Sequence, residues 1–102
     1  MKCLTLILHE SVKQELIDMF RQMPEVTGYT FIQGEGRSSD TERNPFETNR
    51  DRVMGYVPRV RVDLILADEA IEKVMFRLQG CDSCLAGLGI WWVSPVEDWG
   101  QL

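Results

Sequence analysis

The same order of sequence patterns occurs twice along the chain: a short apolar run, an amphipathic stretch and a second apolar run. The first unit covers residues 3–36 and the second covers residues 59–93. A strand, a helix and another strand form one supersecondary unit, so this order predicts two βαβ halves. Two independent cores would not fit into 102 residues, and we therefore expect a single domain over residues 1–102.

The first half opens with residues 3–9, CLTLILH, an apolar run that is too short for a helix and predicts a buried strand. Ser11 is expected to cap the following helix, with Gln14 as its capping-box partner, and Pro24 to end it. The apolar residues of this helix fall on one stripe: Val12, Leu16, Met19, Phe20 and Met23. Residues 29–36, YTFIQGEG, predict a second strand.

The second half opens with residues 59–66, RVRVDLIL, whose strict alternation predicts a half-buried strand. Asp68 is expected to cap the next helix and Gly80 to end it. Residues 88–93, LGIWWV, predict the fourth strand. Its neighbouring tryptophans, Trp91 and Trp92, would point to opposite faces, and we expect one of them to enter the core.

These elements predict an α+β fold, a ferredoxin-like βαββαβ sandwich with both helices on one face of an antiparallel sheet. A polar segment of about 20 residues separates strands two and three, which is long for a compact domain and indicates a functional or disordered loop. Two helices cannot cover all of the apolar strand residues, which include Ile7, Phe31, Ile65, Trp91 and Trp92. The remaining apolar surface predicts oligomerisation.

The net charge of −5 argues against a nucleic-acid partner, which would favour a basic face. No apolar run approaches the ~18 residues that would span a membrane, and the first residues do not resemble a signal peptide, so we expect a cytoplasmic protein without direct membrane insertion. Basic residues still cluster locally, and three of them are Arg37, directly after the predicted second strand, and Arg59 and Arg61 in the third. They could hold an anion such as bicarbonate or phosphate, or they are solvated strand residues.

Several segments resemble the PII signalling proteins, and the match runs nearly end to end. GYTFIQGEGR resembles that family's second strand and the start of its T-loop, VPRVRVDLILADEAIEKV its third strand and second helix, and GIWWVSPVED its last strand. The resemblance implies a homotrimer with clefts between subunits. It also implies a T-loop, here residues 37–57, that reaches a partner such as a membrane transporter. Loop residues that would contact the partner are Asp40, Arg43, Phe46, Arg50 and Arg52.

The sequence also departs from that family. PII proteins that bind ATP or ADP hold the phosphates with a glycine-rich loop ending in Gly-Lys, whereas this chain reads GCDSCLAGLGI and then ends at EDWGQL without a basic tail. The adenine side of the cleft matches better, and this similarity implies a nucleotide or anion site at Ile7, Gly28, Tyr29, Thr30, Gly36, Arg37, Asp63 and Ile65. PII-like relatives with such losses are associated with heavy-metal efflux pumps or with bicarbonate transport and carboxysomes.

Two thiols, Cys81 and Cys84, are spaced so that they can share a soft metal ion, close a small disulfide or serve as ordinary loop residues. One such pair supplies half of a tetrahedral site, which His9, the only histidine, an acidic side chain or another subunit would have to complete. A histidine at a strand end can also be a solvated turn residue.

These observations favour a non-enzymatic regulator, because the sequence offers no recognisable nucleophile beside its one histidine. We expect a trimeric sensor of a small effector, with a transition-metal ion slightly favoured and a heavy-metal efflux pump as its partner. The alternative effectors are ADP, AMP or bicarbonate, with a role in inorganic-carbon transport or carboxysomes. A ligand-free assembly module is the hypothesis from another class.

Overall fold

The structure is a computed structural model, and it describes residues 1–37, 56–80, 85 and 89–102. Four strands form one sheet, β1 (Lys2–His9), β2 (Thr30–Gly36), β3 (Val57–Leu66) and β4 (Gly89–Pro95). The helices are the short 3-10 helix η1 (Glu10–Val12), α1 (Lys13–Arg21) and α3 (Asp68–Gln79). The chain therefore has the mixed α+β composition that the sequence predicts.

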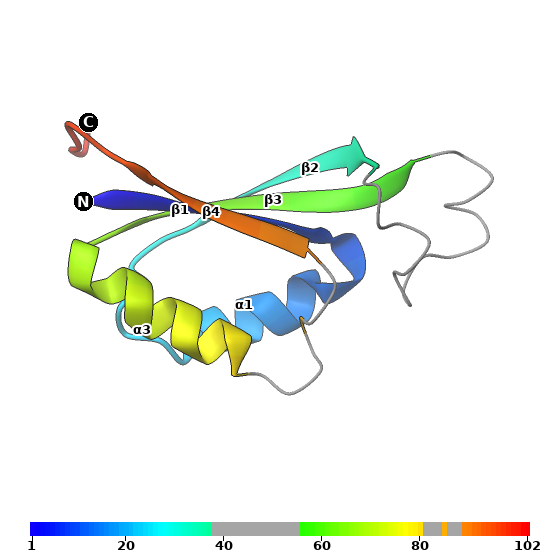
Figure 1. Cartoon of the computed structure of the whole chain (residues 1–102), viewed down its shortest axis with the longest axis horizontal. Helices are drawn as coiled ribbons and strands as arrows, with labels where there is room; N and C mark the ends of the chain where they lie inside the picture. Colours follow the sequence, from blue (N-terminus) through cyan, green and yellow to red (C-terminus); the bar gives the residue numbers. More distant parts are fainter. Residues whose placement is uncertain (38–55, 81–84, 86–88) are drawn as a thin grey trace.

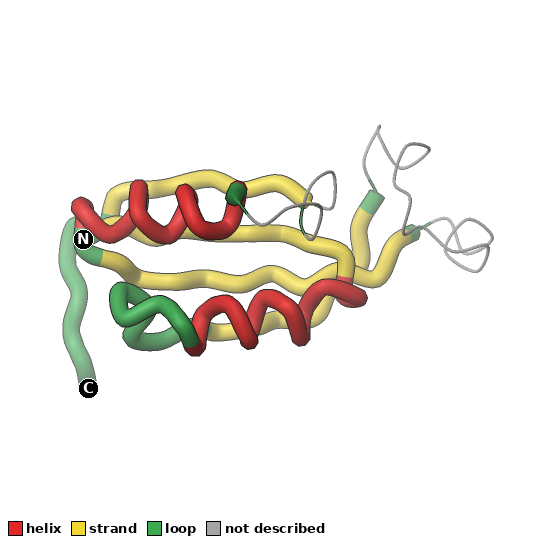
Figure 2. Tube along the Cα trace, turned by 90° about the horizontal axis from the view of Figure 1, so that it is seen from below, coloured by secondary structure: helices red, strands yellow, loops and turns green. Residues whose placement is uncertain are grey.

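The sheet has the order β2-β3-β1-β4, and all of its pairings are antiparallel. Strands β1 and β3 occupy the centre, while β2 and β4 form the edges. Both helices lie along the same side of the sheet, which Figure 1 shows from the side. Figure 2, seen from below, shows the two helices running alongside each other in front of the strands. Arg77 of α3 donates a hydrogen bond to the backbone oxygen of Gln22, just after α1 (3.3 Å).

The core lies between the helices and the sheet, and period-two alternation supplies its strand residues. It contains Leu4, Leu6 and Leu8 of β1, Val60, Val62, Leu64 and Leu66 of β3, Leu16 and Phe20 of α1, and Ala70, Val74, Met75 and Leu78 of α3. The predicted alternation of residues 59–66 is thus confirmed, and so is the apolar stripe of the first helix, while Ala70, Val74, Met75 and Leu78 form the buried face of α3.

The sheet face opposite the helices is called the open face below. By the pairing register it carries Cys3, Thr5, Ile7, Thr30, Ile32, Arg59, Arg61, Asp63, Ile65, Ile90, Trp92 and Ser94. Ile32, Ile90 and Trp92 are exposed there, which confirms that two helices leave apolar surface uncovered. Phe31, in contrast, lies on the helix side and packs against the core.

The expectation that one tryptophan of β4 enters the core is wrong. Trp91 pairs with Leu6 and so takes the helix side, and Trp92 pairs with Thr5 and takes the open face. Nevertheless their side chains are 48% and 38% exposed, respectively. In the described part of the chain, β4 is an edge strand with no neighbouring strand beyond it, and the side chain of Trp91 on its inner face stays in contact with solvent.

Both predicted helix caps also differ from the structure. His9 rather than Ser11 caps the first turn, because its ring nitrogen accepts a hydrogen bond from the Ser11 backbone N–H. Asp68 is the first residue of α3 rather than its cap, and its carboxylate forms an ion pair with the amino terminus at 3.0 Å. The helix α3 ends at Gly80 as expected, whereas α1 ends at Arg21, three residues before Pro24.

Candidate functional site

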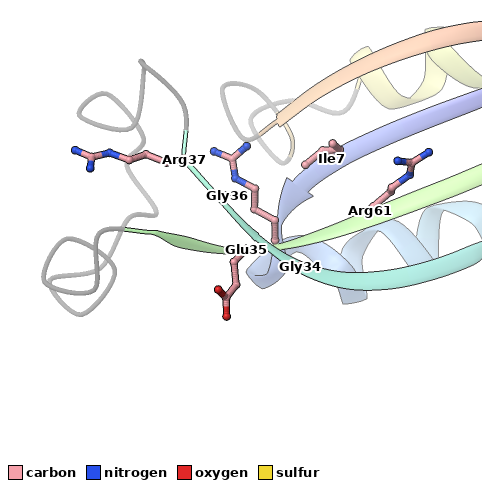
Figure 3. Close-up of a pocket in the computed structure, with 7 residues that line it drawn as sticks. Ile7, Gly34, Glu35, Gly36, Arg37 and Arg61 are labelled. Atoms are coloured by element: carbon pink, nitrogen blue, oxygen red, sulfur yellow. The ribbon is translucent and has the colours of Figure 1, made fainter.

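A pocket of about 190 Å³ opens at the end of the sheet where β2 ends and β3 begins. It is lined by Ile7, Gly34, Glu35, Gly36, Arg37, Arg59 and Arg61 (Figure 3). The register explains why these residues meet, since Gly34 is the pairing partner of Arg59, and Arg61 pairs with both Ile32 and Ile7. The pocket therefore lies at the base of the segment of residues 38–55, beside the two strands that lead into and out of it.

Positive charge dominates this pocket in an otherwise acidic protein. Three arginines and one glutamate line it, while the whole chain has a net charge of −5. Glu35 pairs with Pro58 and points away from Arg61 in Figure 3, as expected for a residue one position from Gly34 and Gly36. Arg37 extends away from the sheet, and Arg61 lies above it. Such guanidinium groups are the preferred partners of carboxylates, phosphates and other oxyanions.

Gly36 gives the side chain of Arg59 the space it occupies. A β-carbon at Gly36 would lie 3.0 Å from Cδ and 3.1 Å from Nε of Arg59, closer than such atoms normally approach. A β-carbon at Gly34, two residues earlier, would meet nothing within 4 Å. The absence of a side chain at Gly36 therefore lets Arg59 lie close against the β2 backbone, at the pocket.

Asp63 lies further along β3 and is held by three neighbours. The Thr5 hydroxyl donates to its carboxylate at 2.6 Å, Arg61 Nε donates at 3.1 Å, and Cys3 Sγ is 3.9 Å away. Partial burial raises the pKa of the Asp63 carboxyl, but the bonds from Thr5 and Arg61 and the charge of Arg61 outweigh this effect and hold the pKa below its ordinary value. Asp63 is therefore a carboxylate near neutral pH.

Arg61 connects the pocket with the middle of the open face. Its guanidinium carbon lies 5.7 Å from the centre of the Trp92 ring, within the range of a cation–π contact. The same guanidinium makes the ion pair with Asp63, and half of its side chain is exposed. Arg61 thus joins a pocket-lining position to an acid on its own strand β3 and to an aromatic ring on β4, on the other side of β1.

The predicted nucleotide or anion residues are only partly brought together. Ile7, Gly36 and Arg37 line the pocket, and Thr30 pairs with Asp63 on the same face. Ile65 lies further along the open face, opposite Cys3. Gly28 and Tyr29 precede β2, and the Tyr29 ring packs on Phe20 at 5.0 Å and on Phe31 at 5.4 Å, on the helix side.

Of the three predicted metal ligands, the structure describes His9. His9 is 6% exposed, and its Nδ1 lies 3.1 Å from the Ser11 nitrogen and 2.8 Å from the Ser11 hydroxyl. An Nδ1 that accepts the Ser11 N–H serves the turn and not a metal ion. Cys81 and Cys84 lie outside the described residues. Within the part of the chain that the structure describes, no three His, Cys, Asp or Glu side chains gather to hold a metal ion.

The predicted partner-binding residues also lie outside the described residues, namely Asp40, Arg43, Phe46, Arg50 and Arg52. Among the helices that are described, none is long and apolar enough to cross a membrane.

Thr5 and Trp92 belong to this site but were not among the residues that the sequence indicated. Thr5 is 1% exposed, and it is the only hydroxyl side chain in the apolar run of β1. A lone hydroxyl in a buried strand needs a hydrogen-bond partner, and that requirement was the available signal. The contact of Trp92 with Arg61 depends on the order of the strands in the sheet, which local sequence patterns do not predict.

A family model covers residues 1–102, that of DUF3240, described as a protein of unknown function. No curated protein matches the chain. Among solved structures, the crystal structure of a DUF3240 family protein from Shewanella baltica OS155 matches with a TM-score of 0.74 and 16% identity, over 99% of this chain and 94% of the other. At that identity the likeness concerns the fold. Because the family model spans the whole sequence, this chain belongs to the DUF3240 family.

Proposed function

We propose that this chain is a PII-like regulatory protein with a ferredoxin-like fold. The order of its elements supports this assignment, because two βαβ units form a sheet in the order β2-β3-β1-β4 with both helices on one side. The resemblance of residues 28–37, 57–74 and 89–98 to PII proteins supports it independently. As in that family, the proposed assembly is a homotrimer, for which the exposed apolar side chains of the open face provide contact surface.

The regulator binds a small anion in the arginine-lined pocket. The observation that carries this proposal is that Arg37, Arg59 and Arg61 line one small cavity next to two glycines, in a protein with a net negative charge. Bicarbonate and the phosphate group of AMP or ADP carry charge of the required sign. A volume of about 190 Å³ accepts either a small oxyanion or one end of a larger ligand.

The position of the pocket supports a signalling role for residues 37–57. Arg37 follows β2 and Arg59 lies near the start of β3, so both ends of the segment border the pocket. An anion that binds one arrangement of these ends more tightly than another shifts the population of segment conformations. A partner such as a membrane transporter would then be bound or released. This role requires no bond making or breaking, and the proposed protein is not an enzyme.

A transition-metal effector stays a prediction. It depends on Cys81 and Cys84, which lie outside the described residues, while His9 uses Nδ1 to cap a turn. The arginines of the pocket repel cations, so a metal ion would have to bind elsewhere. The titration described next therefore includes Zn²⁺ together with the anions.

Isothermal titration calorimetry with sodium bicarbonate, inorganic phosphate, AMP, ADP and ZnCl₂ tests the proposal. We expect at least one of the anions to bind, and Arg59→Gln to weaken that binding about tenfold, because a charge-assisted hydrogen bond contributes roughly 1.5 kcal/mol or more. Lys73→Gln is the matched control, since it removes a cation from the exposed surface of α3 and should leave the affinity unchanged.

Two outcomes would contradict the anion site. In one, none of the anions binds while Zn²⁺ does, and the Zn²⁺ affinity falls in Cys81→Ser and Cys84→Ser, which would restore the metal hypothesis. In the other, an anion binds equally well to the wild type and to Arg59→Gln, which would place its site elsewhere.

A further inference from the structure

Arg61 takes part in two arrangements at once. It lines the pocket with Arg37 and Arg59, and its guanidinium is also held by Asp63 and lies over the Trp92 ring. Nε of Arg61 contacts Oδ2 of Asp63 at 3.1 Å and Oδ1 of Asp63 at 3.4 Å. These contacts direct the guanidinium along β3. Nη2 adds a third contact to Oδ1 at 3.4 Å.

Asp63 cannot easily follow Arg61 if that arginine moves. Its carboxylate accepts the short Thr5 hydrogen bond, and Thr5 is fully buried in the central strand β1. The Arg61 side chain, in contrast, is 49% exposed. Of the two partners, the arginine is the one that can change position.

We propose that Asp63 is an internal competitor for Arg61, and that an anion in the pocket draws the Arg61 guanidinium away from Asp63 and Trp92. This inference rests on the proposed anion site. The competition has a simple electrostatic basis, because one guanidinium cannot offer the same N–H groups to two anions. The competition makes the pocket selective for anions that bind Arg61 more tightly than the fixed Asp63 carboxylate does.

The competition also carries the state of the pocket to the middle of the open face. Trp92 lies in the edge strand β4, and Arg61 lies in β3 on the other side of β1. When Arg61 leaves Trp92, the indole ring loses its cation and the Asp63 carboxylate loses a counter-ion. Binding in the pocket thereby changes the charge pattern in the middle of the open face, the surface through which copies of the chain are proposed to meet.

The first test is calorimetric, with inorganic phosphate and ADP as probes. Asp63→Asn retains an oxygen that can accept the Thr5 hydroxyl but removes the competing charge. We expect it to raise the affinity for the bound probe about two- to fivefold, the range that an exposed ion pair is worth. Glu72→Gln is the matched control: it removes one negative charge from the exposed surface of α3, on the other side of the sheet, and should leave the affinity unchanged. Equal effects of the two substitutions, or no effect of Asp63→Asn, would overturn the competition.

The second test is tryptophan fluorescence during the same titration. We expect a saturable change in emission in the wild type and in Trp99→Phe, but not in Trp92→Phe or Arg61→Gln. A change that persists in Trp92→Phe would contradict the movement of Arg61. If a probe binds in an Arg59-dependent manner and both tests fail, the anion site stands and the competition does not. If no probe binds to the wild type, both proposals are wrong.

Discussion

Gly89→Ala is expected to lower the stability of the protein by about 3 kcal/mol, because overpacking against fixed backbone has a cost of this order. Gly89 opens the edge strand β4 and pairs with Leu8. A β-carbon there would overlap the carbonyl oxygen of Ile7 and the side chain of Leu8. The Ile7 carbonyl belongs to the central strand β1 and cannot move without disturbing the sheet, so the end of β4 must shift instead.

Thermal unfolding at one fixed protein concentration checks this expectation, since association also affects the melting temperature. A loss of about 3 kcal/mol corresponds to a decrease of roughly 12–20 °C in Tm for a domain of this size. Gly34→Ala is the matched control, because Gly34 also lies in an edge strand and its β-carbon would meet nothing within 4 Å. A Tm for Gly89→Ala equal to that of Gly34→Ala would contradict the close packing of β4 on β1.

Leu64→Ala should lower the free energy of unfolding by about 3–4 kcal/mol, in the range observed for large-to-small substitutions in cores. Leu64 is 0% exposed and lies in the central strand β3, within the cluster that joins the sheet to both helices. The substitution removes apolar contacts and leaves a cavity, because the central strands are held on both sides and cannot close around it.

Chemical denaturation with urea measures this effect. Phe76→Ala is the control that separates burial from hydrophobicity, since the Phe76 side chain is large and apolar but 78% exposed on α3. We expect it to change the stability by less than about 0.5 kcal/mol. Similar losses for Leu64→Ala and Phe76→Ala would contradict the location of the core.

The sequence predicted the core better than it predicted the edges. Alternation along residues 59–66 identified the buried face of β3, because every second side chain from Val60 to Leu66 points to the helix side of the sheet and is buried there. The same reasoning failed for Trp91, whose burial depends on which elements cover the inner face of the edge strand β4. Such coverage is a property of the tertiary arrangement and cannot be derived from local periodicity.

Local capping rules were also overruled by the fold. Serine is normally the better helix cap, yet the ring of His9 takes this role, since β1 ends directly before η1 and places the ring beside the Ser11 N–H. This arrangement assigns Nδ1 of His9 to the turn, a role that the sequence alone did not reveal.

For the candidate site, the sequence identified the residues, whereas the pairing of the strands determines which of their side chains lie next to one another. The sequence left open whether Arg37, Arg59 and Arg61 hold an anion or are solvated strand residues, and the structure shows that all three line one pocket. The ion pair of Arg61 with Asp63 and its contact with Trp92 depend on side-chain direction across three strands, β3, β1 and β4. The contribution of Cys81 and Cys84 stays a prediction, because both lie outside the described residues.

The most direct test of the anion site is a residue-resolved NMR titration of the ¹⁵N-labelled protein with bicarbonate, phosphate, AMP and ADP. The account predicts saturable chemical-shift changes that are largest at the amides of Gly34, Gly36 and Arg37, where the pocket is lined by β2. The side-chain Nε–H of Arg59 should shift with the same dissociation constant. Saturable binding with its largest shifts on the far side of the sheet, along α3, would contradict the account, as would the absence of binding by all four anions.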